Sequence, residues 1–173
     1  MLLIFSGLPG VGKTAIARGL ARQLCALHLR IDSIEQAIRV CSPDCDLRDL
    51  GYRVAYAVAE DNLRIGHTVV ADCVNPIQLT RDAWLAVAKR ATVDAVEIEV
   101  RCSDPDEHRR RVETRLADIP GLELPKWSDV VGRDYHPWQR DHLAIDTAGR
   151  SIEQNVKALS DLLTSVCRAS AQS

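Results

Sequence analysis

The sequence predicts an α/β fold in which helices cover both faces of a parallel sheet. Three observations lead to this prediction. Short apolar segments alternate with longer segments whose apolar residues recur every three or four positions, which is the pattern of strands alternating with helices. The strand segments at 2–6 and 68–72 are largely apolar, as in a sheet buried on both faces. The first of them runs directly into a glycine-rich loop.

The elements follow one another along the chain without repeats or long linkers. Strands are predicted at 2–6, 28–32, 68–72, 93–101 and 142–146. Helices are predicted at 13–27, 47–65, 77–90 and 104–115, and from 151 onward. Within 47–65, Leu47, Leu50, Val54 and Val58 are expected to form the inner face. Because parallel strands end at the same edge of a sheet, ligands are expected there.

Helix starts are marked by side chains that can bond free backbone amides. Asp104 precedes Pro105, and Glu107 lies three residues after Asp104, which is typical of a capping box. Ser151 and Gln154 have the same spacing. Both places are therefore predicted to be helix N-termini.

Length and composition indicate a single globular domain over residues 1–173. The net charge of −2 gives no general reason to expect nucleic acid or an anionic membrane as a partner. No apolar run approaches the roughly 20 residues that span a bilayer. The apolar N-terminus follows no basic segment and meets glycines at once, so a signal peptide is not expected. We therefore expect a cytoplasmic monomer or homodimer with reduced cysteines and no zinc site.

The segment GLPGVGKT matches the pattern G-x-x-x-x-G-K-[ST]. Its glycines let backbone amides curve around a phosphate, and the following helix directs its positive end to the same place. In this pattern the lysine reaches the β and γ phosphates, and the hydroxyl residue coordinates Mg²⁺. The candidate nucleotide-binding residues are Gly7, Leu8, Pro9, Gly10, Val11, Gly12, Lys13 and Thr14.

Two carboxylates end predicted strands. Asp72 is interpreted as an Mg²⁺ ligand acting through water; the alternative is a cap of the turn after it. Asp32 can accept a proton from an attacking hydroxyl, or it can cap the helix that begins near Ser33, and both roles are compatible. Asn75, in the turn after Asp72, is a candidate substrate ligand.

A basic stretch is followed by a segment rich in proline and glycine, and residues 109–135 are predicted to form a lid. Arg111 and Arg115 are candidate cations over the transition state, whereas Arg109 and Arg110 are expected at the surface. A solvated basic face is the alternative. Arg133 is a further candidate substrate contact.

Two other segments complete the candidate site. The loop IDTAGRS follows the last predicted strand, and the backbone of Ala148 and Gly149 is a candidate ligand for the nucleotide base. An ordinary strand-to-helix turn is the alternative. Tyr52, Arg53 and Tyr56, on the predicted helix 47–65, are candidate contacts of the acceptor.

The segments GLPGVGKT, RID, VVADCVN, RRRVETR and IDTAGRS occur in the order found in the small P-loop kinases, and together they resemble that family. The family includes gluconate kinase, adenylylsulfate kinase, chloramphenicol phosphotransferase and the zeta-toxin kinases. The resemblance implies a five-stranded parallel sheet, ATP and Mg²⁺ as cosubstrates, and a closing lid. It also implies that Asp32 is the base or the ligand of the substrate hydroxyl, and that Arg111 and Arg115 are lid arginines. The lid itself resembles none of these enzymes closely.

Three functions are compatible with these features. The leading one is an ATP-dependent kinase that phosphorylates a hydroxyl of a small molecule. A kinase acting on a nucleic-acid end would need a basic channel, and the acidic balance weighs against it. A nucleotide-dependent regulatory binding module is the third. The absence of an N-K-x-D string makes a GTP-specific version of it less favoured.

Overall fold

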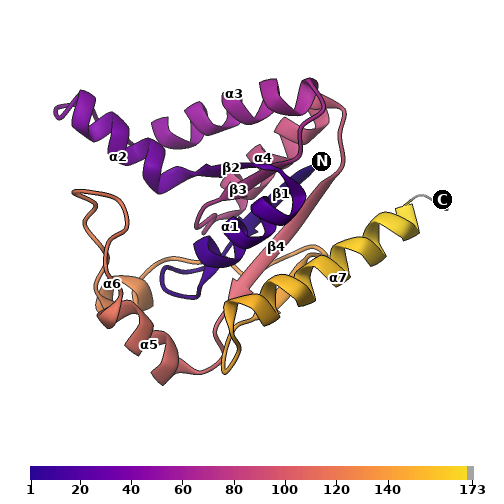
Figure 1. The fold of residues 1–173 in the computed structure, drawn as a ribbon. Coiled ribbons are helices and arrows are strands. Elements are labelled where there is room, and N and C mark those ends of the chain that lie inside the picture. Colours follow the sequence, from indigo (N-terminus) through magenta and orange to yellow (C-terminus); the bar gives the residue numbers. More distant parts are fainter. Residues whose placement is uncertain (171–173) are drawn as a thin grey trace.

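A five-stranded parallel sheet forms the centre of the protein (Figure 1). The computed structural model describes residues 1–170, with side chains described as far as residue 165. The strand order is β2-β3-β1-β4-β5, and every neighbouring pair is parallel. The strands are β1 (Leu2–Ser6), β2 (Leu27–Arg30), β3 (Val69–Asp72), β4 (Ala95–Arg101) and β5 (Leu143–Asp146). The predicted parallel sheet is therefore confirmed.

Helices connect the strands and lie on both faces of the sheet (Figure 1). They are α1 (Lys13–Leu24), α2 (Ile31–Cys41), α3 (Leu50–Arg64), α4 (Gln78–Ala91), α5 (Pro105–Thr114), α6 (Trp127–Val131) and α7 (Ile152–Ser170). The short helix α6 within the lid segment was not predicted from the sequence. Within residues 1–170, no helix combines the length and the apolar character needed to cross a bilayer.

The alternation of side chains along β1 divides the core into two layers. Leu3 and Phe5 pack with α1 and α7, whereas Leu2 and Ile4 pack with α3 and α4. All four side chains are fully buried. This double burial explains why the strand is apolar from Leu2 to Phe5.

Helix α3 turns a different face to the sheet from the one expected. Its buried residues are Gly51, Ala55, Ala59 and Leu63, while Val54 and Val58 are each 38% exposed. The predicted inner face is therefore wrong by about a quarter turn. Small side chains on the buried face let the helix lie close to its neighbours, and a pattern of large apolar residues does not indicate such a face.

The lid segment lies beyond the edge where the strands end. In Figure 1, α5 and α6 lie below this edge, and the chain between them reaches back toward α2. The loop after β1, the end of β3 and the start of α2 meet at the same edge, because all five strands run in one direction. The topology thus brings the candidate residues to one place.

Candidate nucleotide and acceptor site

The loop between β1 and α1 can be built only with glycine at key positions. Gly7, Gly10 and Gly12 have φ values of 137°, 88° and 96°, a region that side chains disfavour. A Cβ on Gly7 would lie 2.1 Å from the carbonyl oxygen of Val100. A Cβ on Gly10 would lie 2.4 Å from a methyl group of Val112. The loop therefore packs closely on both β4 and α5.

The backbone of this loop directs its amides and its carbonyls to different partners. Among residues 1–170, the amides of Gly10, Val11 and Gly12 form no backbone hydrogen bond, and α1 begins without a side-chain cap. The carbonyl of Pro9 instead bonds His108 Nε2 at 2.8 Å, and the carbonyl of Val11 accepts from Thr147 Oγ1 at 2.9 Å. Free amides at a helix N-terminus suit a phosphate group.

His108 and Thr147 are positioning residues that were not predicted from the sequence. His108 is buried on α5 and stands edge-on to the Trp127 ring, with centroids 5.1 Å apart. Thr147 follows β5 and is also buried. The indication in the sequence is weak: His108 and Val112 are four residues apart and form the buried face of a very polar helix.

Lys13 lies inside the loop. Its side chain is only 8% exposed, and Nζ donates to the carbonyl oxygen of Leu8 at 3.1 Å. Burial lowers the pKa of the Lys13 ammonium, and the negative charges of Asp72 and Asp32 oppose this effect. A phosphate in the loop would add negative charge beside Nζ and favour the charged amine.

Asp72 is the buried carboxylate at the end of β3. His28 Nε2 lies 3.3 Å from its Oδ2, and the Thr14 hydroxyl is near enough to act on its pKa. Burial alone would raise the pKa of Asp72, but the His28 contact, the charge of Lys13 and the nearby Thr14 hydroxyl together hold it below its usual range. Asp72 is thus kept as a carboxylate next to a hydroxyl.

The pair Thr14 and Asp72 fits Mg²⁺, which binds oxygen ligands and typically takes only one or two of them from the protein. In the described part of the chain, no group of three or more His, Cys, Asp or Glu residues is arranged to hold a metal. A cation here would complete its shell with nucleotide phosphates and water.

Strand β2 ends two residues earlier than predicted, so Asp32 lies beyond the strand. Strand β2 ends at Arg30, and α2 begins at Ile31 with Arg30 in the N-cap position. Asp32 therefore neither ends the strand nor caps the helix, so the predicted strand-end position and the predicted capping role are both wrong. It belongs to the first turn of α2, where its half-exposed carboxylate lies 3.3 Å from Arg30 Nη2.

Of the two lid arginines, Arg115 is the one that approaches this group. It lies at the end of α5, and its buried Nε has no hydrogen-bond partner in the described structure. Burial lowers the pKa of Arg115, and the charge of Asp32 opposes this. The charge of Arg115 also acts on Lys13. Lys13, Asp32, Asp72 and Arg115 thus form one group of interacting charges, called the charge cluster below.

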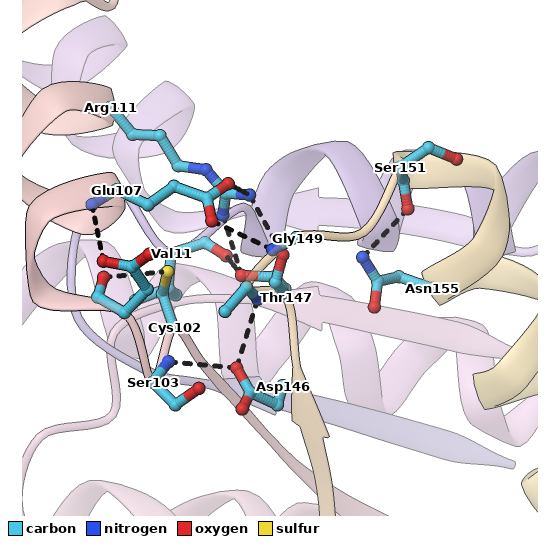
Figure 2. A network of polar contacts seen from close by, with 12 residues as sticks. Val11, Cys102, Ser103, Glu107, Arg111, Asp146, Thr147, Gly149, Ser151 and Asn155 are labelled. Carbon is cyan, nitrogen blue, oxygen red and sulfur yellow. Dashed lines mark hydrogen bonds and ion pairs between the residues drawn. The ribbon is translucent and has the colours of Figure 1, made fainter.

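Arg111 has different partners. Figure 2 shows its guanidinium between α5 and the β5–α7 loop. Nη1 donates to Thr147 Oγ1 at 2.8 Å and Nη2 to the Thr147 carbonyl at 3.0 Å. Nη2 also lies 2.5 Å from Glu107 Oε1. A role of Arg111 over the transition state remains a prediction, and in this structure Arg111 joins α5 to the loop.

The β5–α7 loop is tied to α5 by Glu107. The other oxygen of this carboxylate accepts from the amide of Gly149 at 2.9 Å (Figure 2), while the amide of Ala148 donates to Asp146 at 3.2 Å. Both amides are therefore used within the protein. Binding of the nucleotide base by Ala148 and Gly149 remains a prediction and would use other atoms of the loop.

One predicted capping box is confirmed, and the other is half confirmed. Ser151 and Gln154 exchange hydrogen bonds of 2.8 Å and 3.2 Å. Asp104 caps α5 by accepting from the amides of Asp106 and Glu107 at 3.0 Å. Glu107 does not return a bond to Asp104, because its carboxylate is held by Arg111 and Gly149 instead.

The candidate acceptor residues differ in placement. Asn75 is fully buried, with Nδ2 donating to the carbonyl of Phe5 at 3.1 Å. The backbone N–H of Asn75 donates to the hydroxyl of Tyr52 at 3.3 Å. Tyr56 stands edge-on to the ring of Trp84 at 4.7 Å. Asn75 and Tyr52 therefore join the end of β3 to α3.

The two candidate arginines of the acceptor site are exposed. Arg53 lies on the exposed side of α3. Arg133 follows α6, and it faces α2: burial raises the pKa of Glu35, and the charge of Arg133 opposes this rise. Arg133 is thus near enough to α2 for its charge to act on Glu35.

Comparisons with known proteins agree with this geometry. In structure, the chain is similar to the Mycobacterium tuberculosis APS kinase CysC, solved in complex with AMPPNP and APS, at 21% identity and a TM-score of 0.69 over 94% of this chain and 96% of that one. It is similar to a gluconokinase from Sinorhizobium meliloti at 18% identity and a TM-score of 0.66 over 99% and 96%. Chaetomium thermophilum Kti12, in complex with ADP-AlF3, gives 23% identity and 0.66 over 93% and 98%.

At these identities the similarities establish the fold, a P-loop domain shared with several kinases. A comparison with curated proteins finds no significant match. A protein-family model, by contrast, matches residues 2–124, which is more than half of the chain. The matched residues include the phosphate loop, Asp32, Asp72 and Arg115. The chain belongs to the AAA domain family AAA_33.

Proposed function

We propose that this protein is a kinase that transfers the γ-phosphoryl group of ATP to a hydroxyl of a small molecule. A bond forms between the acceptor oxygen and the γ-phosphorus, and the bond from that phosphorus to the β–γ bridging oxygen breaks. The acceptor proton passes to Asp32, and ADP leaves. Bound ATP would supply the phosphoryl group, and bound Mg²⁺ would neutralise part of its charge.

The observation that carries this proposal is the charge cluster. Lys13, Asp32, Asp72 and Arg115 come from four different segments, yet the charges of the other three all act on Lys13 beside the open amides of the phosphate loop. Phosphoryl transfer needs little covalent help from a protein. It needs positioned positive charge, a held phosphate and a proton acceptor.

Each member of the cluster suits one of these tasks. Lys13 would hold the terminal phosphates, and Thr14 with Asp72 would hold Mg²⁺. Arg115 would face the charge that develops on the transferred group. Asp32 is half exposed, so its carboxylate remains accessible to an acceptor hydroxyl. The residues proposed to border the acceptor are Tyr52, Asn75 and Arg133, together with Arg53 and Tyr56 of α3.

Two neighbours in the structural comparison support a small acceptor. Both the APS kinase and the gluconokinase are named for small molecules, and this chain covers 96% of each. For the present protein the acceptor is therefore proposed to be a small hydroxyl compound.

The test is ADP formation with a panel of sugars, nucleosides and hydroxylated antibiotics, with the product identified by mass spectrometry. Asp32→Asn should lower turnover by about 100- to 10,000-fold while ATP still binds. Asp61→Asn, a matched change at an exposed position of α3, should have no effect. Full turnover by Asp32→Asn would exclude Asp32 as the base.

The similarity to Kti12 in complex with ADP-AlF3 keeps a regulatory binding module as the second candidate. Such a module would bind nucleotide and form no phosphorylated product with any acceptor. A change in affinity for a protein partner between the ATP and ADP forms would favour it. Strongly salt-dependent binding of an oligonucleotide would instead favour a nucleic-acid end as acceptor.

A further inference from the structure

One carboxylate in the lid holds two arginines of the main body. Asp118 lies between α5 and α6 and accepts from Arg30 Nη1 with both oxygens, at 2.8 and 2.9 Å. Its Oδ2 also lies 2.6 Å from Arg18 Nη2. Arg18 belongs to α1 and Arg30 ends β2. Asp118 therefore joins the lid to α1, which follows the phosphate loop, and to the end of β2.

The Arg30 contact has the features of a strong ion pair. Both carboxylate oxygens accept from Arg30 Nη1 in this charge-assisted contact, and the Arg30 side chain is only 10% exposed, although that of Asp118 is 43% exposed. Burial alone would raise the pKa of Asp118, but the hydrogen bonds from Arg30 and Arg18 outweigh it and lower that pKa. By comparison, many surface ion pairs contribute little because both partners are flexible and solvated.

A second contact holds the same loop. Gln36 Nε2 on α2 donates to the carbonyl oxygen of Pro120 at 3.3 Å. A Cβ on Gly121 would lie 2.9 Å from this nitrogen, so the chain passes close against α2. The loop thus rests on α1, β2 and α2 together.

Arg115 is only three residues from Asp118. The chain leaves the helix at Arg115, where ψ is 145°, so α5 does not fix the direction of the loop beyond it. Fixing Asp118 fixes the other end of this short connection. The half-buried position of Arg115, facing Asp32 and Lys13, depends on both ends.

Arg30 is also shared between the lid and Asp32. Its Nε and Nη2 face Asp32 Oδ2 at 3.4 and 3.3 Å, longer than the 2.8 and 2.9 Å bonds of its Nη1 to Asp118. With the loop in place, Arg30 is held mainly by Asp118. If the loop lifts, the guanidinium loses that partner and is free to close on Asp32.

We propose that Asp118 is a positioning residue that latches the lid through Arg30 and Arg18, places Arg115 at the phosphate loop and keeps Arg30 from closing on Asp32. The latch is a property of the fold. Its effect on turnover rests on the proposed function.

The first measurement needs no acceptor. Arg115 and Lys126 bound the loop and are trypsin sites, so cleavage there reports how often the loop opens. In Asp118→Asn, initial cleavage after Arg115 and Lys126 should accelerate about five- to tenfold, as expected for losing a charged hydrogen-bonded pair that is partly exposed. Cleavage after Arg48, which is 82% exposed at its side chain, is the internal reference.

Matched variants separate the latch from a general loss of charge. Glu123→Gln changes an exposed residue of the same loop and should leave cleavage unchanged. Arg30→Lys keeps the charge but loses the guanidinium contact with both oxygens, so it should accelerate cleavage as Asp118→Asn does. The double variant should be no faster than the faster single one, because both remove the same interaction. Asp118→Glu should restore part of the protection.

The second measurement uses turnover, once an acceptor is known. Asp118→Asn should lower kcat about tenfold and change the KM for ATP less than twofold, because the phosphate loop itself is intact. Unchanged cleavage in Asp118→Asn, or additive effects in the double variant, would overturn the latch. If no acceptor is ever phosphorylated, the proposed function fails, and the cleavage data still decide the latch.

Discussion

Removing the hydroxyl of Thr147 tests whether its hydrogen bond to the Val11 carbonyl stabilises the phosphate loop. Thr147→Val preserves the shape of a buried side chain and deletes the donor to the Val11 carbonyl. Arg111 loses one bond but keeps the Thr147 carbonyl and Glu107. The principal cost is one buried carbonyl without a partner, about 2 kcal/mol. For a domain of this size the melting temperature should fall by about 4 to 8 °C.

The assay is thermal unfolding followed by circular dichroism, with calorimetry of ATP binding on the same samples. ATP affinity should weaken about tenfold, because the Val11 peptide loses the contact that turns its amide toward the phosphate. The control is Thr164→Val, which removes an exposed hydroxyl that bonds its own helix at 2.9 Å, and it should shift the melting temperature by less than about 2 °C. Equal shifts in the two variants, or an unchanged ATP affinity in Thr147→Val, would refute the bracing role.

Three other perturbations test separate parts of the structure. Arg81 is fully buried and donates to three backbone carbonyls, so Arg81→Met should lower the free energy of unfolding in urea by about 3 kcal/mol or more; a loss below about 1 kcal/mol would contradict this. Because the pKa of Asp72 is lowered in the folded state, its contribution to stability is present above the usual aspartate pKa and is lost as the pH falls through the folded-state pKa. Asp72→Asn should therefore flatten the loss of stability at acid pH. An unchanged dependence of stability on pH in this variant would contradict that role of Asp72. Gly10→Ala should weaken ATP binding, because its Cβ would meet Val112 at 2.4 Å, and normal affinity by calorimetry would show that the loop can shift.

Much of the fold could be predicted because its evidence is local. The strands β1 and β3 are buried on both faces and largely apolar, and the five predicted strands all form, with ends that differ by no more than two residues. The phosphate loop is equally local: Gly7 to Thr14 are consecutive, and each glycine meets a backbone requirement of its own segment. Such features are fixed by neighbours in the sequence.

Prediction failed where a side chain had more than one partner to choose from. Glu107 has the spacing of a capping box, yet Arg111 and Gly149 hold its carboxylate. The inner face of α3 was assigned to the large residues Val54 and Val58, but tertiary packing selected Ala55 and Ala59. The local sequence pattern indicates which partners or faces are possible, and tertiary contacts determine which one forms.

The positioning residues were beyond reach because their partners are distant in sequence. His108 and Pro9 are 99 residues apart, and His28 and Asp72 are 44 apart. A single histidine in a polar helix has many uses, and nothing near His108 indicates a carbonyl across the molecule. The residue types of the charge cluster were predictable, whereas the contacts that orient them were not.

The contacts of α5 restrict how the lid can move. His108 bonds the phosphate loop, Val112 packs against Gly10, and Arg111 is tied to the β5–α7 loop. If α5 swung as a rigid body, it would break all three and disturb the phosphate loop. Helix α6 is also held, because Trp127 packs on His108. We therefore expect the hinge to lie at Arg115, where the backbone leaves the helix.

The moving part of the lid is thereby confined to the loop that begins after Arg115 and ends before Trp127. Its polar contacts with the body include the ion pairs of Asp118 and the bond from Gln36 to Pro120, and no residue of this loop belongs to either hydrophobic core cluster. Such a loop can open at low cost while the phosphate loop keeps its shape. Arg115 stands at the junction of the fixed and moving parts, so a small rotation there would carry its charge toward or away from the transferred phosphoryl group.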